Sequence, residues 1–272
     1  MRSGSVCGSL PVTPGAVLAA SPDHSGQSLL SRAAAAVQRL VWSRRASSWG
    51  HHGGLSVQPV VDEILRQTPR GPGAHVLDIG CGTGTLALPL ALQGTIVTAV
   101  DVSPAMTRAV KALAEESELD NLTVVTASAD VIQFPDASLD AVISNYALHH
   151  LRDPDKKALI RSAARWLKPG GVLLVGDMMF GRGATHQDRR IIRDKVVALA
   201  RKGPGGWWRI AKNAVRFLLR VQEMPLPPGR WVRLLEEAGL VEVSCSPVLG
   251  EASIVRGVRP GNLAATSEST RN

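Results

Sequence analysis

Short apolar runs alternate with stretches of helical periodicity through most of the chain. Five runs have the length and the Val, Ile and Leu content of buried strands, at 75–80, 95–100, 122–126, 139–144 and 172–177. Between them, apolar residues recur every three or four positions, which predicts helices over 58–67, 85–92, 104–118 and 154–167. This alternation predicts an α/β fold with a Rossmann-like, doubly wound and mostly parallel sheet, covered by helices on both faces.

Further elements are expected on both sides of this core. The spacing of apolar residues predicts helices over 29–42, 188–201, 207–221 and 231–238, and a C-terminal antiparallel hairpin of strands over 240–244 and 253–258. Residues 1–27 and 260–272 lack any period, and we expect them to be disordered. The chain then divides into that start, N-terminal helices over 28–70, an α/β domain over 71–259 with a helical insertion at 182–230, and the tail 260–272.

The net charge of +8 belongs to the insertion. From Arg182 to Arg230 there are 12 Lys and Arg against 3 Asp and Glu, which leaves 19 against 20 in the rest of the chain. Such a segment is typical of a contact with an acidic ligand, a membrane surface or nucleic acid, or it is simply a solvated helical face. The three scattered cysteines favour a reducing compartment and oppose a zinc site. We therefore expect a cytoplasmic protein that binds no metal. The insertion is expected to make peripheral contact with a membrane.

The strongest chemical signal is a glycine turn that follows the first expected strand. Residues 76–84 have the sequence VLDIGCGTG, and a helical pattern begins directly after them. Glycine has no Cβ, so a ligand can lie against this backbone. The G-x-G-x-G spacing differs from the G-x-G-x-x-G that suits a dinucleotide pyrophosphate. The carboxylate of Asp78 would repel a pyrophosphate, whereas it suits the ammonium and sulfonium charges of S-adenosylmethionine.

The same stretch resembles the first motif of the class I S-adenosylmethionine-dependent methyltransferases. Four further segments resemble motifs of that family in the family's order: Asp101 at the end of the second strand, Ser128-Ala129-Asp130 with Phe134-Pro135, the segment from Asn145 to Leu151, and the segment from Leu167 to Gly171. The resemblance spans roughly residues 47–258. It is nearest to the branch with ubiquinone- and menaquinone-type enzymes, which act on small molecules.

The resemblance implies a cofactor site for S-adenosylmethionine. It assigns close backbone approach to Gly80, Gly82 and Gly84, the methionine ammonium to Asp78, the ribose to Asp101 with Val102 beside it, the adenine to Ala129 and Asp130, the sulfonium region to Asn145, and a capping role to Trp49. A plain Rossmann turn is the alternative for the glycines, a helix cap for Asp130 and ordinary packing for Trp49.

Methyl transfer from a sulfonium is an in-line displacement, and positioning alone can supply about 7–11 kcal/mol of the acceleration. A hydroxyl, amine or acidic carbon would need a base, and His149 or His150 could serve, with structural packing as the alternative. We expect the insertion to form a lid over a small, hydrophobic acceptor. An RNA methyltransferase, a catalytically silent binding module and a nicotinamide-dependent oxidoreductase are the rival functions.

Overall fold

The structure is a computed structural model, and it describes residues 57–181, 186–201, 203, 205, 207 and 224–261. Trp49, the expected helix over 29–42 and nearly all of the expected helix over 207–221 lie outside these residues. Among the described helices, none is both long and apolar enough to cross a membrane.

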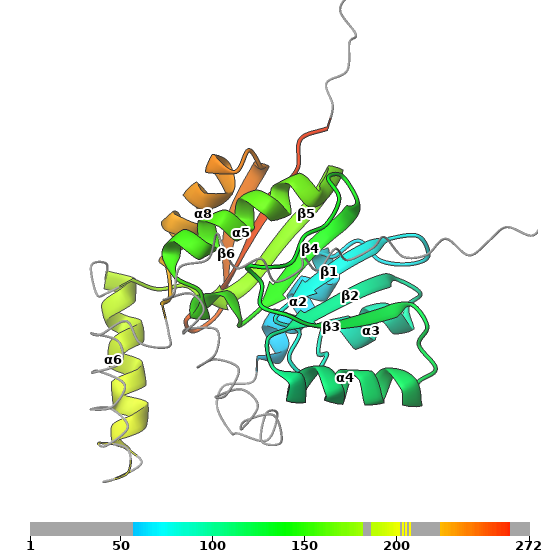
Figure 1. The fold of residues 1–272 in the computed structure, drawn as a ribbon. Helices are drawn as coiled ribbons and strands as arrows, with labels where there is room; N and C mark the ends of the chain where they lie inside the picture. Colours follow the sequence, from blue (N-terminus) through cyan, green and yellow to red (C-terminus); the bar gives the residue numbers. More distant parts are fainter. Residues whose placement is uncertain are drawn as a thin grey trace, which may run out of the picture.

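The centre of the fold is a seven-stranded sheet with the order β3-β2-β1-β4-β5-β7-β6 (Figure 1). The strands are β1 (His75–Ile79), β2 (Ile96–Asp101), β3 (Leu122–Thr126), β4 (Leu139–Asn145), β5 (Leu167–Met178), β6 (Val241–Leu249) and β7 (Ala252–Val258). The first five are parallel, and β7 is antiparallel to both β5 and β6. This confirms the expected α/β fold with its C-terminal hairpin.

Helices cover both faces of the sheet. One face packs against α2 (Gln58–Gln67), α3 (Ala87–Leu92) and α4 (Pro104–Glu116), and the other against α5 (Asp153–Trp166) and α8 (Pro228–Glu237). Neighbouring residues of β1 face opposite cores, because Val76 packs with the first group and Leu77 with the second. Burial on both faces explains why the parallel strands are continuous apolar runs.

The α4 helix begins as its sequence predicts. Ser103 is the N-cap, its Oγ accepts a hydrogen bond from the Met106 N–H at 3.4 Å, and Pro104 occupies the first turn. The α3 helix begins two residues later than expected. The glycine turn continues into it, since the Gly84 N–H donates to the Cys81 carbonyl and the Leu88 N–H to the Gly84 carbonyl.

Two strands are longer than the apolar runs that predicted them. The segment from Leu167 to Gly171, which precedes the strand expected over 172–177, begins β5 because Leu167 pairs with Leu139 and the Gly170 N–H donates to the Arg259 carbonyl. Strand β6 extends to Leu249 instead of residue 244, because Ser246, Pro247 and Leu249 all have partners in β7. The extension of β5 depends on partners that are distant in the sequence, whereas β6 continues into a hairpin in which the β7 partners of these three residues follow within eight residues.

Candidate functional site

The strand order reverses between β1 and β4, so the carboxyl ends of these strands border a crevice where open α/β sheets bind ligands. A cavity of about 300 Å³ lies there. Among the residues that the sequence singled out, its lining contains Asp78, Gly80, Gly82, Asp101, Val102, Ala129, Asn145 and His150. Gly84, Asp130 and His149 are not part of the lining, and Trp49 lies outside the described residues.

The glycine turn forms the floor of this cavity for a steric reason. Gly80 has a φ of +73°, and a Cβ built on it would lie 2.2 Å from the Cβ of Ala147. Gly82 has a φ of +53°, and a Cβ there would meet no atom within 4 Å. The first glycine thus lets the segment after β4 approach β1, and the second leaves open space over the backbone.

Asp78, near the end of β1, lines this cavity. The residue is 1% exposed, and its Oδ2 has no hydrogen-bond partner among the described residues. Burial, with the nearby charge of Asp101, raises the pKa of Asp78 to about 7, and the Ala87 backbone N–H opposes this shift. The cavity therefore holds a buried acid that a cationic ligand would ionise.

A second buried acceptor lies at the end of β4. The Oδ1 atom of Asn145 is buried and lacks a hydrogen-bond partner within the described part of the chain, and Asn145 lines the same cavity as Asp78. Buried polar atoms in folded proteins are nearly always paired. Two residues of one cavity lining thus each carry an orphan oxygen, which favours a ligand with hydrogen-bond donors or positive charge, such as the ammonium and sulfonium groups of S-adenosylmethionine.

Asp101 joins the glycine turn to the end of β2. Its Oδ2 accepts a hydrogen bond from the Gly82 N–H at 2.9 Å, and its Oδ1 accepts one from the Ser103 N–H at 2.8 Å. Burial raises the pKa of Asp101, whereas these two hydrogen bonds act in the opposite direction. Each oxygen has further lone pairs. The arrangement can therefore hold the turn in place and still accept hydrogen bonds from two ribose hydroxyls.

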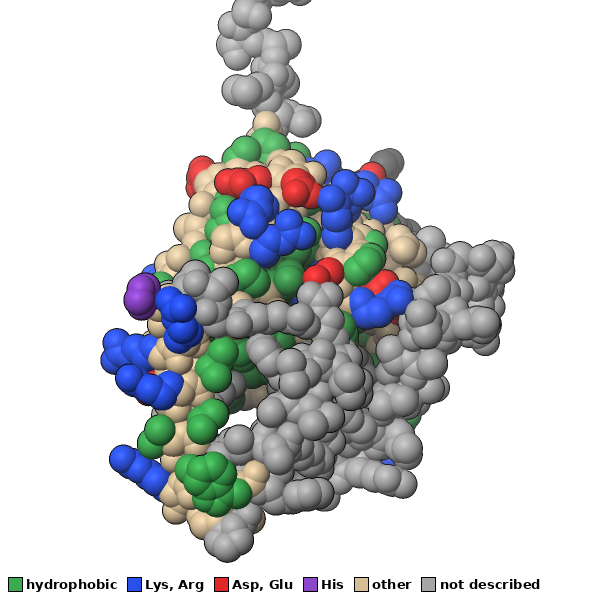
Figure 2. Space-filling model, turned by 90° about the vertical axis from the view of Figure 1, so that its left-hand side faces the viewer, with side chains coloured by type: hydrophobic (Ala, Val, Ile, Leu, Met, Phe, Trp, Pro, Cys, Tyr) green, Lys and Arg blue, Asp and Glu red, His purple; other side chains and the backbone are tan. Residues whose placement is uncertain are grey.

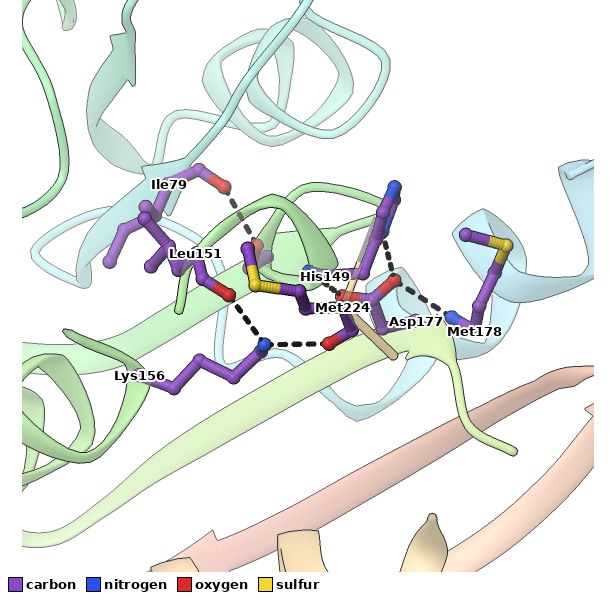
Figure 3. Close-up of polar contacts among 8 residues, drawn as sticks. Ile79, His149, Leu151, Lys156, Asp177, Met178 and Met224 are labelled. Carbon is purple, nitrogen blue, oxygen red and sulfur yellow. Dashed lines mark hydrogen bonds and ion pairs between the residues drawn. The ribbon is translucent and has the colours of Figure 1, made fainter. Parts of the chain in front are cut away.

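His149 faces Asp177 and not the cavity (Figure 3). Its Nδ1 lies 2.6 Å from Asp177 Oδ1, and its backbone N–H donates to Asp177 Oδ2 at 2.8 Å. The Met178 N–H also donates to Asp177 Oδ1. The two side chains are only 6% and 0% exposed. If Nδ1–H donates a hydrogen bond to the Asp177 carboxylate, the neutral ring carries its lone pair on Nε2.

His150 is the histidine that lines the cavity, and its ring centroid lies 3.9 Å from that of His149. The two histidines belong to a single turn of 3-10 helix, η3 (Leu148–His150), which directs one ring toward the cofactor cavity and the other toward Asp177. The sequence offered both as candidate bases, and the structure distinguishes them by their partners.

The turn that carries the histidines is fastened by a buried cation (Figure 3). Lys156 is fully buried, and its Nζ donates hydrogen bonds to the carbonyls of Leu151 at 2.6 Å and Met224 at 2.7 Å. The Met224 N–H in turn donates to the His149 carbonyl at 2.7 Å. Backbone groups of His149 and Leu151, which precede residues 182–223 in the chain, therefore lie close to those of Met224, which follows them.

Sequence reasoning missed several residues of the site. Asp177 was not proposed as a site residue, although an acid at the end of a buried strand is a usable signal. Tyr146 has a φ of +49°, lines the cavity and lies edge-on to His149 with 6.4 Å between ring centroids. Such a backbone conformation is uncommon for an aromatic residue and concentrates at functional sites. Burial, with the charges of Glu251 and Asp177, raises the pKa of the Tyr146 hydroxyl.

Comparison with known proteins agrees with this geometry. Residues 76–171 match the family model described as a methyltransferase domain. The 27-O-demethylrifamycin SV methyltransferase of Amycolatopsis mediterranei is 35% identical over 122 residues, 44% of each chain. The ubiquinone biosynthesis O-methyltransferase of Xylella fastidiosa is 36% identical over 132 residues, 47% of this chain and 52% of that protein. The chain thus spans about half the length of these curated relatives.

A solved S-adenosylmethionine-dependent methyltransferase from Aquifex aeolicus shares the fold. The TM-score is 0.54 at 17% identity, over 80% of this chain and 98% of that one. The family model covers the glycine turn, Asp101, Asn145 and both histidines, and the solved structure extends the likeness in fold beyond that stretch. Through residues 76–171 the chain is thus similar to methyltransferases, and it shares its fold with a solved S-adenosylmethionine-dependent methyltransferase.

Proposed function

We propose that this protein transfers the methyl group of S-adenosylmethionine to an oxygen of a small, apolar molecule. The observation that carries the proposal is the pairing of two sites at one edge of the sheet. One is the cavity with the orphan oxygens of Asp78 and Asn145, and the other is the His149–Asp177 pair at the end of the neighbouring strand. The first suits a cationic cofactor, and the second suits an acceptor that must lose a proton.

The residues of the cavity would hold the cofactor along its length. Asp78 would take the ammonium, Asn145 would lie at the sulfonium, and Asp101 would accept from the ribose hydroxyls. Ala129, which lines the cavity beyond β3, would border the adenine. The bound cofactor supplies a methyl group already activated by the positive sulfur.

His149 would act on the acceptor. Asp177 would fix its ring through Nδ1, so that Nε2 could take the proton of an acceptor hydroxyl while the bound cofactor supplies the methyl group. The electron pair of the cleaved C–S bond would stay with the cofactor's sulfur, and the buried carboxylate of Asp177 would stabilise the imidazolium formed on His149. The base then returns its proton to water.

An apolar cluster lies beside this pair. Met178 and Phe180 are buried directly after Asp177, and Tyr146 and Ile192 pack against them. This cluster suits a hydrophobic acceptor. The names of both curated relatives also specify methylation at oxygen. The rival functions rest on less: the RNA alternative on basic charge alone, and the silent module on no feature of this site.

Two measurements test the proposal separately. Calorimetry with S-adenosylmethionine and S-adenosylhomocysteine, with NAD as the control, tests the cofactor. Transfer of labelled methyl groups to a panel of phenols, catechols and aliphatic alcohols tests the acceptor. In His149→Gln we expect S-adenosylhomocysteine affinity to change less than threefold or so, and turnover to fall about 10²–10⁴-fold.

His150→Gln serves as the matched control, since it alters the neighbouring ring and leaves Asp177 with its partner. Unchanged turnover in His149→Gln would remove the base from the proposal. Failure of both cofactor ligands to bind the folded protein would remove the cofactor site.

A further inference from the structure

The α6 helix (His186–Ala200) extends away from the sheet, as Figure 1 shows. No described helix or strand makes extended contact with it. Its inner side is nevertheless anchored: Asp188 is buried and accepts a hydrogen bond from the Gly181 N–H at 2.6 Å, and Ile192 packs against Met178 and Phe180. The helix therefore has a defined orientation, with one side toward the body and another toward solvent.

The outer side combines arginines with apolar residues. Arg189, Arg193, Val196, Val197 and Ala200 are spaced i, i+4, i+7, i+8 and i+11, which places them on one face of the helix. Val196 is 38% exposed, Val197 is 42% exposed, and Trp207, shortly beyond the helix, is 61% exposed. Figure 2 shows the side of the molecule on which α6 lies. Basic side chains (blue) and hydrophobic side chains (green) occur together on its surface.

The charge of this face is strongly positive. The exposed charged side chains described from 186 to 201 are Arg189, Arg190, Arg193, Arg201 and Asp194. Asp194 is already paired, with Arg193 at 3.2 Å and Arg190 at 3.9 Å. The other acid, Asp188, is on the inner side. The exposed charged side chains described from 186 to 201 thus carry a net charge of about +3 at neutral pH, two of them on the face that also carries Val196 and Val197.

We propose that this face of α6 docks on an anionic lipid surface. Arginines bind lipid phosphates while their aliphatic stems cover apolar surface, and valine and tryptophan side chains suit the boundary between headgroups and acyl chains. A nucleic acid would use the arginines but would offer no apolar environment to Val196 and Val197. The mixture of the two residue kinds therefore favours a membrane over RNA. This inference concerns location and goes beyond the proposed methyl transfer.

The charge contribution sets the size of the expected effect. Each basic residue near an anionic membrane strengthens partitioning by about fivefold. Replacing Arg189 and Arg193 should therefore weaken binding by at least about 25-fold, and reversing their charge adds repulsion from the lipids. Because the attraction is electrostatic, raising the salt concentration should weaken it as well.

The test is sedimentation of the full-length protein with vesicles of phosphatidylcholine alone or with about 30% phosphatidylglycerol. The variant is Arg189→Glu with Arg193→Glu. The matched control is Arg108→Glu with Lys111→Glu, which reverses two exposed charges on α4 and lowers the net charge equally. Circular dichroism and S-adenosylhomocysteine binding verify that each variant is folded. A Trp207→Ala variant tests the apolar contribution.

We expect wild type and the α4 control to sediment with the anionic vesicles only, the α6 variant to remain in solution, and Trp207→Ala to bind more weakly. Equal loss in both double variants would show that net charge, and not this face, is responsible. Equal binding to neutral vesicles, or none to either kind, would overturn the proposal. The proposal would also be overturned if the protein did not bind vesicles but bound tRNA in a salt-sensitive way, and if the α6 variant lost that binding.

Discussion

Replacing Asp78 by Asn should stabilise the ligand-free protein and abolish its principal contact with a cationic cofactor. The pKa of Asp78 is about 7 in the folded protein against 3.8 ordinarily. The unfolded chain ionises this group above pH 3.8, whereas the folded chain retains the proton until about pH 7. Ionisation therefore opposes folding, and its cost grows as the pH rises between these two values and is constant above them.

The magnitude follows from that displacement. It amounts to about three pH units, and each unit corresponds to about 1.4 kcal/mol, so the cost approaches about 4 kcal/mol at about pH 8 and falls below about 1 kcal/mol at about pH 4. Asparagine carries no charge at either pH, and its side-chain oxygen can still accept a hydrogen bond from the Ala87 N–H. The variant should therefore gain most of its advantage over wild type in alkaline solution.

Urea unfolding monitored by tryptophan fluorescence measures this difference directly. The free energy of unfolding of Asp78→Asn minus that of wild type should increase by about 3 kcal/mol between about pH 4 and pH 8. S-adenosylhomocysteine provides an internal control at the higher pH: it should stabilise wild type and have little effect on the variant. A difference that does not change with pH, or that favours wild type as the pH rises, would refute the electrostatic reasoning.

Three further changes test other parts of the site. Cofactor binding at about pH 7 should release close to half a proton per site as Asp78 ionises, and calorimetry in buffers of different ionisation enthalpy measures it; no dependence on the buffer would contradict the raised pKa. Gly80→Ala should cost at least about 2 kcal/mol of unfolding free energy, because its Cβ would meet Ala147; Gly170→Ala, whose Cβ would meet nothing, is the control at a similar positive φ. Lys156→Met should cost about 1–3 kcal/mol for each carbonyl left unpaired, at Leu151 and Met224; a stability equal to wild type would show that these bonds contribute nothing net.

The sequence predicted those features that depend on local pattern. The parallel strands were recognisable because both of their faces are buried, which makes each a continuous apolar run. The cofactor turn was recognisable because close backbone approach requires glycine, and α4 because its cap and proline are adjacent. The extension of β5 was not predictable in this way, since its partners Leu139 and Arg259 are remote in the sequence. The extension of β6 lacks an apolar run, because its residues 245–249 are mixed in polarity and are held by pairing with β7.

The His149–Asp177 pair escaped prediction for the same reason. The two residues are 28 positions apart, and only the adjacency of β4 and β5 brings them together. The register pairs Asn145 with Gly176, so the residue after Gly176 falls beside the turn that follows Asn145. Both histidines looked equivalent in the sequence. What separates them is the direction that η3 gives each ring, and that is set by contacts with Asp177 and residue 224.

The proposed reaction moves a positive charge across this edge of the sheet, and the buried acids lie at the two ends of its path. Before transfer the charge would be on sulfur, in the cavity of Asp78 and Asn145. After transfer the sulfur would be neutral, and the proton lost by the acceptor would make His149 cationic beside Asp177. In a buried site such charges are weakly screened, so fixed carboxylates at both positions favour the cationic species there. The loss of charge at sulfur weakens the hold on the product, while the gain at His149 is compensated without reorganisation of solvent. The placement of acids on β1 and β5 is therefore suited to turnover as well as to binding.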